Sequence, residues 1–524
     1  MQHFPLLLHK FIDHAAKWHG ASEVVTGGGE THARIGYAGL RERAMRLSGA
    51  FEALGLTVGD RIATLAWNTQ GHMETWYAAL GIGVTCHTLN PRIGAAPLID
   101  MVTQANDRVL VASADQADAV EAIADACPGI AHVVILDEPG TADLRRPVPA
   151  RARVWEQQEL IDALGREVAW GGFDEESEAG LCFTSGTTGA PKGVPYTHRS
   201  NYLQTLTVLQ ADVMALTARE VVLAAVPMFH ANGWGLAFAA PAAGTKFVLP
   251  GRHTDGERLA RLINAEGVTL AVGVATVWLG LIDHLDTAGG DVPTLGRVIL
   301  GGAPVPQALM DRIEQRLGVT VQTSWGMTEL SPLGTISPVS AGNRDARRSG
   351  RPPVGIDLCV ADATGAPLAQ QRGAEGRLLV RGASVVDRYF GQDEPATYPS
   401  GWFDTGDLAM IGADGDLTIT GRSKDLIKSG GEWINPGEIE AIVGALPAVG
   451  LVAVIGRAHP KWGERPVIVL EERAGESASD DELRQALDGR IPRWWMPEAV
   501  VRLDRMPLAH TGKIDKARLR RELG

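Results

Sequence analysis

The sequence of 524 residues contains only four cysteines, no long apolar run and fewer basic than acidic side chains. The cysteines are scattered, without the paired spacing of a disulfide framework or a zinc site. They are Cys86, Cys127, Cys182 and Cys359. We therefore expect reduced thiols and a cytoplasmic protein. Charged and polar residues interrupt residues 1–20 and 220–246, so neither a signal peptide nor a transmembrane segment is expected.

The charge balance limits the classes of partner. With 49 Lys and Arg against 62 Asp and Glu, the net charge is 49 − 62 = −13. Such a surface repels a phosphate backbone, so no nucleic-acid partner is expected. The composition, 45% hydrophobic and 21% charged, excludes a disordered chain. The length allows about three structural units.

Alternating apolar and amphipathic segments indicate the fold class. Short apolar runs at 61–66 and 109–112 alternate with helix-length stretches such as 37–56, which predicts βαβ units and a mostly parallel sheet. The same alternation returns after residue 195. Its apolar runs are 221–226, 246–249, 268–274 and 297–300. They predict a second α/β layer system.

The pattern changes in the last third of the chain. Between 351 and 420 short strands such as 376–381 are separated by Gly, Asp and Pro turns, which predicts a small β-rich subdomain. The last hundred residues read as a compact α+β unit, with a strand at 451–455 and a helix at 480–487. We predict an α/β protein with an N-terminal domain of residues 1–423, built of two sheet layers and the subdomain, and a C-terminal domain of residues 424–524.

One loop points to phosphate chemistry. The segment 184–194 follows an apolar strand and combines three glycines with hydroxyl residues and Lys192. Glycine permits close backbone approach, so its N–H groups and hydroxyls can surround phosphate oxygens. The order differs from the loop of P-loop nucleoside triphosphatases, because Ala-Pro precedes Lys192. The expected phosphate-binding residues are Thr184, Ser185, Gly186, Thr187, Thr188, Gly189 and Lys192.

At this segment the sequence resembles the adenylate-forming superfamily of acyl-CoA synthetases, luciferases and peptide-synthetase adenylation domains. The resemblance covers nearly the whole chain. It is closest to the medium- and long-chain fatty acid CoA ligases, including the methylmercaptopropionate-CoA ligase-like branch. It implies an enzyme that uses ATP, Mg²⁺ and CoA, forms an acyl-adenylate, and releases AMP and pyrophosphate. It also implies a mobile C-terminal domain with its hinge at Lys424.

The resemblance assigns most nucleotide contacts. Segments 300–304 and 323–329 are similar to the adenine-binding pair of the family. The residues implied there are Gly302, Ala303, Pro304, Ser324, Trp325, Gly326, Met327 and Thr328. Asp407 is implied to accept hydrogen bonds from the ribose hydroxyls, with Arg422 as a further ribose or phosphate contact.

Metal and catalytic roles follow in the same way. Glu329 and Thr184 are implied to hold Mg²⁺, which prefers oxygen ligands. Lys513, in the segment 506–516, is implied to be the lysine of the adenylation step. The catalytic residues implied by the resemblance are thus Thr184, His230, Glu329 and Lys513.

The segment 227–235 concerns the acid. It resembles the family segment in which His230 lies beside the acyl carboxylate. Amino-acid-activating relatives carry Asp at this position, so a simple carboxylic acid is favoured. Trp234 is either a gate to the acyl tunnel or a packing indole, and Val274 is either a pocket wall or ordinary core. The implied acyl-binding residues are His230, Trp234, Val274, Gly301 and Gly326.

The segment 428–436 resembles the loop that approaches the pantetheine chain of CoA. Its implied contacts are Gly430, Gly431, Glu432 and Trp433, with a plain turn as the other interpretation. For the whole chain we favour a medium- or long-chain fatty acid CoA ligase. The alternatives are a ligase for methylmercaptopropionate or an aryl acid, acyl loading onto a carrier protein, a nucleotide sensor, and a luciferase. The resemblance also favours a homodimer formed through the N-terminal region.

Overall fold

The strands of the two largest sheets are short runs of branched, buried side chains. The computed structural model describes residues 1–28, 32–141, 143–184, 191–303, 305–339, 345–473, 475–509 and 514–524. All four residues of strand β5 (Val109–Ala112) and of strand β13 (Arg297–Leu300) are buried. Burial on both faces is typical of parallel sheets covered by helices.

The first sheet has seven strands, and all its neighbours are parallel except the last pair. In spatial order the strands are β7 (Arg153–Glu156), β6 (His132–Ile135), β5, β3 (Arg61–Leu65), β4 (Thr85–Thr88), β8 (Glu178–Thr184) and β9 (Lys192–Thr197). The antiparallel β8–β9 hairpin at one edge carries the predicted phosphate loop between its strands.

The second sheet has eight strands and antiparallel pairs only at its two ends. The order is β15 (Leu333–Ile336), β14 (Thr320–Gly326), β13, β12 (Leu270–Gly273), β10 (Val221–Ala224), β11 (Lys246–Leu249), β1 (Glu23–Thr26) and β2 (Ala33–Gly36). The carboxyl ends of its parallel strands meet at one edge, which is where α/β proteins form their sites.

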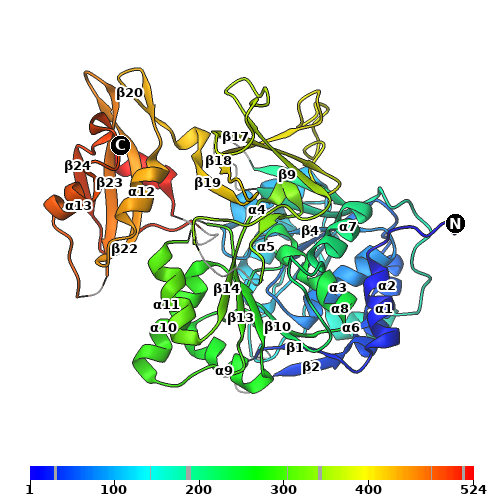
Figure 1. Ribbon diagram of the computed structural model, residues 1–524. Helices are drawn as coiled ribbons and strands as arrows, with labels where there is room; N and C mark the ends of the chain where they lie inside the picture. Colours follow the sequence, from blue (N-terminus) through cyan, green and yellow to red (C-terminus); the bar gives the residue numbers. More distant parts are fainter. Residues whose placement is uncertain are drawn as a thin grey trace.

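Helices cover both sheets and fill the space between them (Figure 1). Helices α4 (Ala95–Ala105) and α5 (Ala117–Ala126) pack on the outer face of the first sheet. Three others cover the outer face of the second: α9 (Gly256–Glu266), α10 (Ala275–Ala288) and α11 (Gln307–Leu317). The shared core contains α1 (His9–Trp18), α2 (Tyr37–Ala53), α3 (Gln70–Gly81), α7 (His198–Val208) and α8 (Leu236–Ala243). Helix α6 (Gln157–Leu164) packs with α2 and α3.

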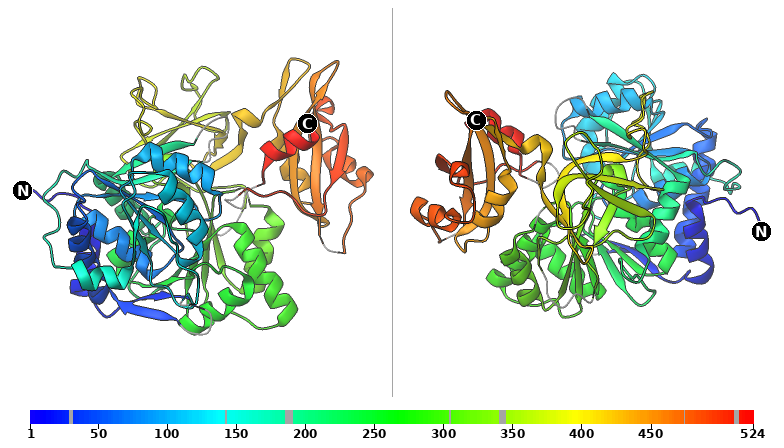
Figure 2. Two further views of the ribbon diagram at one scale, coloured as in Figure 1. Left: turned by 180° about the vertical axis from the view of Figure 1, so that it is seen from behind. Right: turned by 45° about the horizontal axis from the view of Figure 1, so that its top comes forward.

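The last third of the chain forms two further sheets. The small antiparallel sheet contains β16 (Ile356–Ala361), β17 (Glu375–Gly382), β18 (Phe403–Ile411) and β19 (Leu417–Arg422). The C-terminal sheet contains β21 (Glu432–Ile434), β20 (Ile427–Ser429), β23 (Gly463–Glu472), β22 (Val449–His459) and β24 (Ala499–Arg502). Its helices are α12 (Pro436–Val443), α13 (Asp480–Leu487) and α14 (Lys516–Leu523). This unit stands beside the large one in every view (Figure 2).

The expected α/β class, with a large N-terminal part of two sheet layers and a separate α+β C-terminal unit, is confirmed. The boundary at residue 424 stays a prediction. Among the described residues, no helix is both long enough and apolar enough to cross a membrane. The four cysteines are buried and unpaired.

The buried carboxylate of Glu266 links helix α9 to strands at one edge of the second sheet. The side chain of Glu266, at the end of α9, is 1% exposed and contacts His32 at 2.7 Å, Lys246 at 2.8 Å and Arg34 at 2.9 Å. Burial raises the pKa of Glu266, but the hydrogen bonds from Lys246, His32 and Arg34 outweigh burial and lower the pKa to about 2. The carboxylate therefore joins α9 to β11, β2 and the residue before β2.

We expect Glu266→Gln to lower the free energy of unfolding by about 3 kcal/mol at neutral pH, because Arg34 and Lys246 lose their buried carboxylate partner and His32 loses its hydrogen bond to the same carboxylate. A carboxylate with a lowered pKa stabilises the folded state above its unfolded pKa, near 4.5, and this contribution disappears as the pH falls toward 2. The free energies of unfolding of the unmodified protein and of Glu266→Gln, measured by denaturant titration at several pH values, should therefore become equal in acid. Glu257→Gln, which removes an exposed pair on the same helix, is the control and should change little. A constant difference at every pH would contradict the assignment.

Candidate active site

The ends of the predicted phosphate loop lie opposite each other on the β8–β9 hairpin. Thr184 ends β8 and is paired in register with Lys192 of β9. The Thr184 hydroxyl donates to the Lys192 carbonyl oxygen over 3.4 Å. The intervening predicted contacts, Ser185, Gly186, Thr187, Thr188 and Gly189, lie outside the described residues. The Thr184 hydroxyl and the Lys192 ammonium group thus belong to the residues at the two ends of the predicted phosphate loop.

Glu329 lies beside this hairpin, in the short helix η3 (Thr328–Leu330), and is 8% exposed. Its Oε1 accepts a hydrogen bond of 3.0 Å from the Tyr389 hydroxyl. The Lys192 ammonium lies 4.7 Å from the centroid of the Tyr389 ring. Burial raises the pKa of Glu329, while the bond from Tyr389 and the charges of Arg422 and Lys192 act in the opposite direction.

Tyr389 therefore connects two residues that the sequence assigned to phosphate and metal binding. Sequence reasoning missed it, because a single Tyr in the run Asp387–Gly391 carries no motif. Only its contact with Glu329, from a residue 60 positions away, reveals it.

The predicted ribose contact, Asp407 of β18, is 3% exposed and has two cationic or polar neighbours. Trp325 of β14 donates its indole N–H to Oδ2 of Asp407 over 2.8 Å. Arg422, paired with Asp407 in register on β19, places its Nε 2.9 Å from Oδ1. The sequence placed Trp325 among the predicted adenine contacts. The structure adds that the edge of the same ring orients Asp407.

The two predicted adenine segments follow neighbouring strands. β13 and β14 are parallel and paired, with Leu300 opposite Thr323. The Ser324 hydroxyl donates to the Leu300 carbonyl over 2.9 Å, so the carboxyl ends of the two strands are joined directly. A methyl group added at Gly326 would collide with the Pro332 carbonyl oxygen. Gly302, Ala303, Met327 and Thr328 occupy these loops, and Pro304 lies outside the described residues.

The acyl segment forms an unusual left-handed turn. His230 precedes the turn η2 (Ala231–Gly235), in which all five residues have positive φ. The values for Ala231, Asn232 and Trp234 are 44°, 52° and 56°. Such angles are unfavourable for residues other than glycine and cluster at functional sites. The sequence did not predict this conformation.

In this turn the Trp234 ring lies close to Gly301 and Gly302. A methyl group added at Gly301 would lie 2.8 Å from Cη2 of the Trp234 ring. One added at Gly302 would lie 3.9 Å from the same ring and 3.6 Å from Cγ1 of Val274. The structure therefore brings together Trp234, Val274 and Gly301, three of the predicted acyl contacts. Gly326 instead faces the backbone near Pro332.

The predicted hinge, Lys424, lies in the short helix η4 (Ser423–Asp425), with ion-paired residues on both sides. On its N-terminal side Arg422 contacts Asp407. On its C-terminal side Asp425 contacts Arg520 at 2.7 Å and Lys516 at 3.9 Å, both from α14. Burial lowers the pKa of Lys424, and the charge of Arg422 lowers it further. The predicted adenylation lysine, Lys513, lies outside the described residues.

The predicted CoA loop is a tight hairpin between β20 and β21. Gly430 and Gly431 have φ of 62° and 92°, which glycine adopts readily. Gly430 donates its N–H to the Trp462 carbonyl over 2.7 Å, and Trp433 is 54% exposed beside Glu432. The backbone of Gly430 and Gly431 thus carries no side chains, and the exposed indole of Trp433 lies nearby in the sequence.

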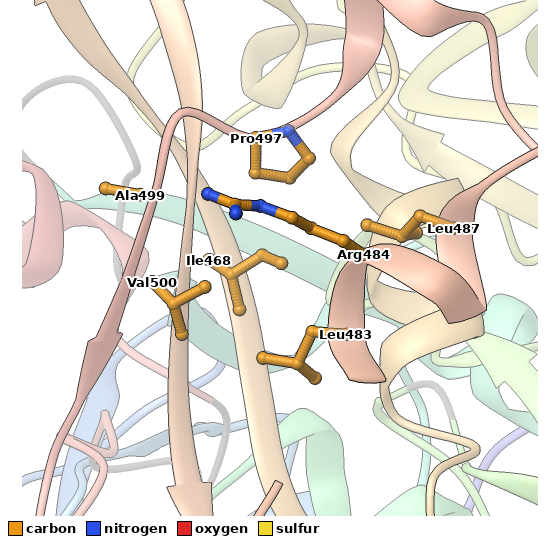
Figure 3. Close-up of a pocket in the computed structure, with 7 residues that line it drawn as sticks. All are labelled: Ile468, Leu483, Arg484, Leu487, Pro497, Ala499 and Val500. Carbon is orange, nitrogen blue, oxygen red and sulfur yellow. The ribbon is translucent and has the colours of Figure 1, made fainter. Parts of the chain in front are cut away.

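Two hollows lie away from these residues. One, in the C-terminal unit, is lined by seven mainly aliphatic residues (Figure 3) and has a volume of about 10 Å³, the space of one water molecule. The other, of about 540 Å³, opens between β1, α3 and the start of α6. Neither contains a residue predicted for the site. No group of three or more His, Cys, Asp or Glu side chains that could hold a metal ion occurs in the described part of the chain.

Comparisons with known proteins agree on one family. Residues 11–390 match the sequence model of the AMP-binding enzyme family, and residues 438–513 match that of the AMP-binding enzyme C-terminal domain. The chain is 41% identical to 3-methylmercaptopropionyl-CoA ligase of Ruegeria lacuscaerulensis, covering 99% of this chain and 97% of the relative. It is 37% identical to medium-chain-fatty-acid–CoA ligase of Ectopseudomonas oleovorans, covering 99% and 96%.

A solved structure supports the same grouping. ATP-bound MatB from Rhodopseudomonas palustris superimposes with a TM-score of 0.85 at 25% identity, over 99% of both chains. The expected resemblance to the adenylate-forming enzymes is thereby confirmed. The chain belongs to the AMP-binding enzyme family and is an AMP-forming acyl-CoA ligase, for which ATP and CoA are the co-substrates.

Proposed function

We propose that this ligase activates a short, linear carboxylic acid about the size of 3-methylmercaptopropionate. The observation that carries the proposal is the position of Trp234, whose ring lies against Gly301 and near Gly302, which Val274 also approaches. An acyl chain that extends past His230 would meet this indole. The 41% identity to a ligase named for 3-methylmercaptopropionate supports the same size class.

A medium-chain fatty acid is the second candidate, supported by the 37% identity to a medium-chain ligase. It requires the Trp234 ring to leave Gly301. The two candidates therefore differ in a single side-chain position, and the chain-length preference of the enzyme distinguishes them.

In the first half-reaction, one carboxylate oxygen attacks the α-phosphorus of ATP, and the bond from that phosphorus to the bridging oxygen breaks to release pyrophosphate. His230 orients the carboxylate, and Lys192 with the loop from Thr184 to Gly189 neutralises phosphate charge. Lys513 supplies a further positive charge. Asp407 and Arg422 hold the ribose, and the segments that follow β13 and β14 hold adenine.

Glu329 and Thr184 fit a magnesium site by their chemistry. They offer one carboxylate and one hydroxyl oxygen, and Tyr389 already holds one oxygen of Glu329 in place. Mg²⁺, bound there together with ATP phosphates, would withdraw charge from the reacting phosphate. In the second half-reaction the CoA sulfur attacks the acyl carbon, and AMP leaves. The C-terminal unit, residues 424–524, turns about Lys424 and brings Gly430, Gly431, Glu432 and Trp433 to the pantetheine chain.

The buried, unpaired thiols support a reducing compartment such as the cytoplasm. A homodimer formed through the N-terminal region stays part of the proposal, and sedimentation of the purified chain tests it.

The chain-length preference tests the proposal directly. In assays of CoA-dependent AMP release we expect propionate and 3-methylmercaptopropionate to be better substrates than octanoate and palmitate. Trp234→Ala should raise kcat/KM for octanoate by roughly tenfold or more, because the pocket gains room for methylene groups. Trp18→Ala removes an indole that is 66% exposed on α1 and serves as the control. A maximum at octanoate or palmitate in the unmodified enzyme would refute the short-acid assignment.

Tyr389→Phe tests the role of Glu329. Loss of the hydrogen bond to the charged carboxylate raises the pKa of Glu329 further, so less carboxylate is present at a given pH. The acid limb of the pH profile for ATP–pyrophosphate exchange should therefore move to higher pH. Tyr398→Phe, whose hydroxyl contacts Asp404 at 3.2 Å, is the matched control and should leave the profile in place. If the unmodified enzyme, Tyr389→Phe and Tyr398→Phe have the same pH profile, the assignment of Glu329 to the adenylation step is wrong.

Lys513→Ala separates the half-reactions. We expect it to abolish formation of the acyl-adenylate while thioester formation from supplied acyl-adenylate stays largely intact. Rapid-quench assays of each half-reaction measure both. Arg521→Ala, which removes an exposed cation from α14, is the control. If both half-reactions decline equally, the assignment of Lys513 to adenylation is wrong.

A further inference from the structure

The side chain of Asn68 spans the two main sheets. Asn68 lies just after β3 of the first sheet and is 4% exposed. Its amide Nδ2 donates to the carbonyl oxygens of Ala224 at 2.9 Å and Val226 at 2.7 Å. Its Oδ1 accepts from the backbone N–H of Met228 at 2.7 Å. One side chain thus holds three alternate backbone groups of the segment that leaves β10 of the second sheet.

That segment leads directly to His230. The chain after Met228 closes a turn in which the His230 N–H donates to the Pro227 carbonyl over 3.1 Å. The His230 carbonyl then accepts from Gly233 over 3.1 Å, at the start of the left-handed turn. Because Asn68 fixes the backbone up to Met228, its bonds determine where the following His230 can lie.

Neighbouring residues brace the same segment. The ring of Trp67 lies edge-on to the ring of Phe229, with centroids 5.8 Å apart. Both oxygens of Asp115 accept from the Trp67 indole N–H, at 3.0 and 3.1 Å. The Arg92 guanidinium lies 5.6 Å from the Trp67 ring and 5.7 Å from the Phe229 ring. The residue next to His230 is therefore also held from the first sheet.

We propose that Asn68 is a positioning residue for the acid, acting through the backbone of residues 224–228 to set His230 against the substrate carboxylate. The inference rests on the proposed role of His230. A buried amide is suited to this task, because it can donate twice and accept once where hydroxyls and carboxylates cannot. Small displacements of a substrate contact have large kinetic effects, since a shift of about 1 Å can reduce the rate roughly 100-fold.

Three variants test the proposal. Asn68→Ala leaves two buried carbonyls and one N–H without partners, and Asn68→Asp places a carboxylate against both carbonyls. Asn68→Ser keeps an acceptor for Met228 and serves if the other two fail to fold. The matched control is Gln371→Ala in the small sheet, whose amide also donates to two carbonyls and accepts from one N–H. His230→Ala is measured alongside.

Steady-state kinetics with 3-methylmercaptopropionate or octanoate, whichever acid the enzyme prefers, give the readout. We expect Asn68→Ala to lower kcat/KM for the acid by roughly 10- to 100-fold, mainly through KM, with the KM for ATP within about twofold. Gln371→Ala should change neither KM. Equal rises in both KM values, or a lowered melting temperature with unchanged kinetics, would overturn the inference. If His230→Ala leaves the KM of the acid unchanged, the role of His230 itself fails and the inference fails with it.

Discussion

The carboxylate of Asp407 is the point on which the geometry of the predicted nucleotide site depends. A carboxylate buried this deeply needs charged or polar partners, and it finds them on two different sheets. Trp325 reaches it from the second large sheet, and Arg422 from the last strand of the small sheet. The small sheet is thereby held in a fixed relation to the strands that carry the predicted adenine segments. A shift of one sheet against the other would break the bond from Trp325, while Arg422 would move together with Asp407.

The geometry of the predicted acyl site depends on close packing and not on ion pairs. Gly180 on β8 and Gly301 after β13 both lie next to side chains of the left-handed turn. A methyl group at Gly180 would approach the Asn232 amide to 3.1 Å, and one at Gly301 would contact the Trp234 ring. The turn is therefore packed between both large sheets, which holds three residues other than glycine at angles that a free chain avoids. The same packing that sets the backbone also sets the direction of the indole.

Local patterns in the sequence predicted the elements well. The apolar run 109–112 and the capped segment 480–487 appear as β5 and α13, because burial on both faces and the Ser479 capping box are local signals. Contiguous motifs also located the loops of the candidate site. Tyr389 and Asn68 could not be found in this way. Each acts through contacts with residues 60 to 160 positions away, and single polar residues carry no periodicity that would mark them.

The ion pairs on the two sides of Lys424 have a consequence for how such proteins can diversify. Asp425, Lys516 and Arg520 all lie after the proposed hinge at Lys424, so the ion pairs of Asp425 stay within the C-terminal unit. Arg422 and its partner Asp407 both lie before it. A genetic exchange with its crossover at Ser423 or Lys424 would pass on each set of paired charges complete. The chain at Ser423 and Lys424 is therefore a place where halves from different ancestors can be joined with these particular ion pairs intact.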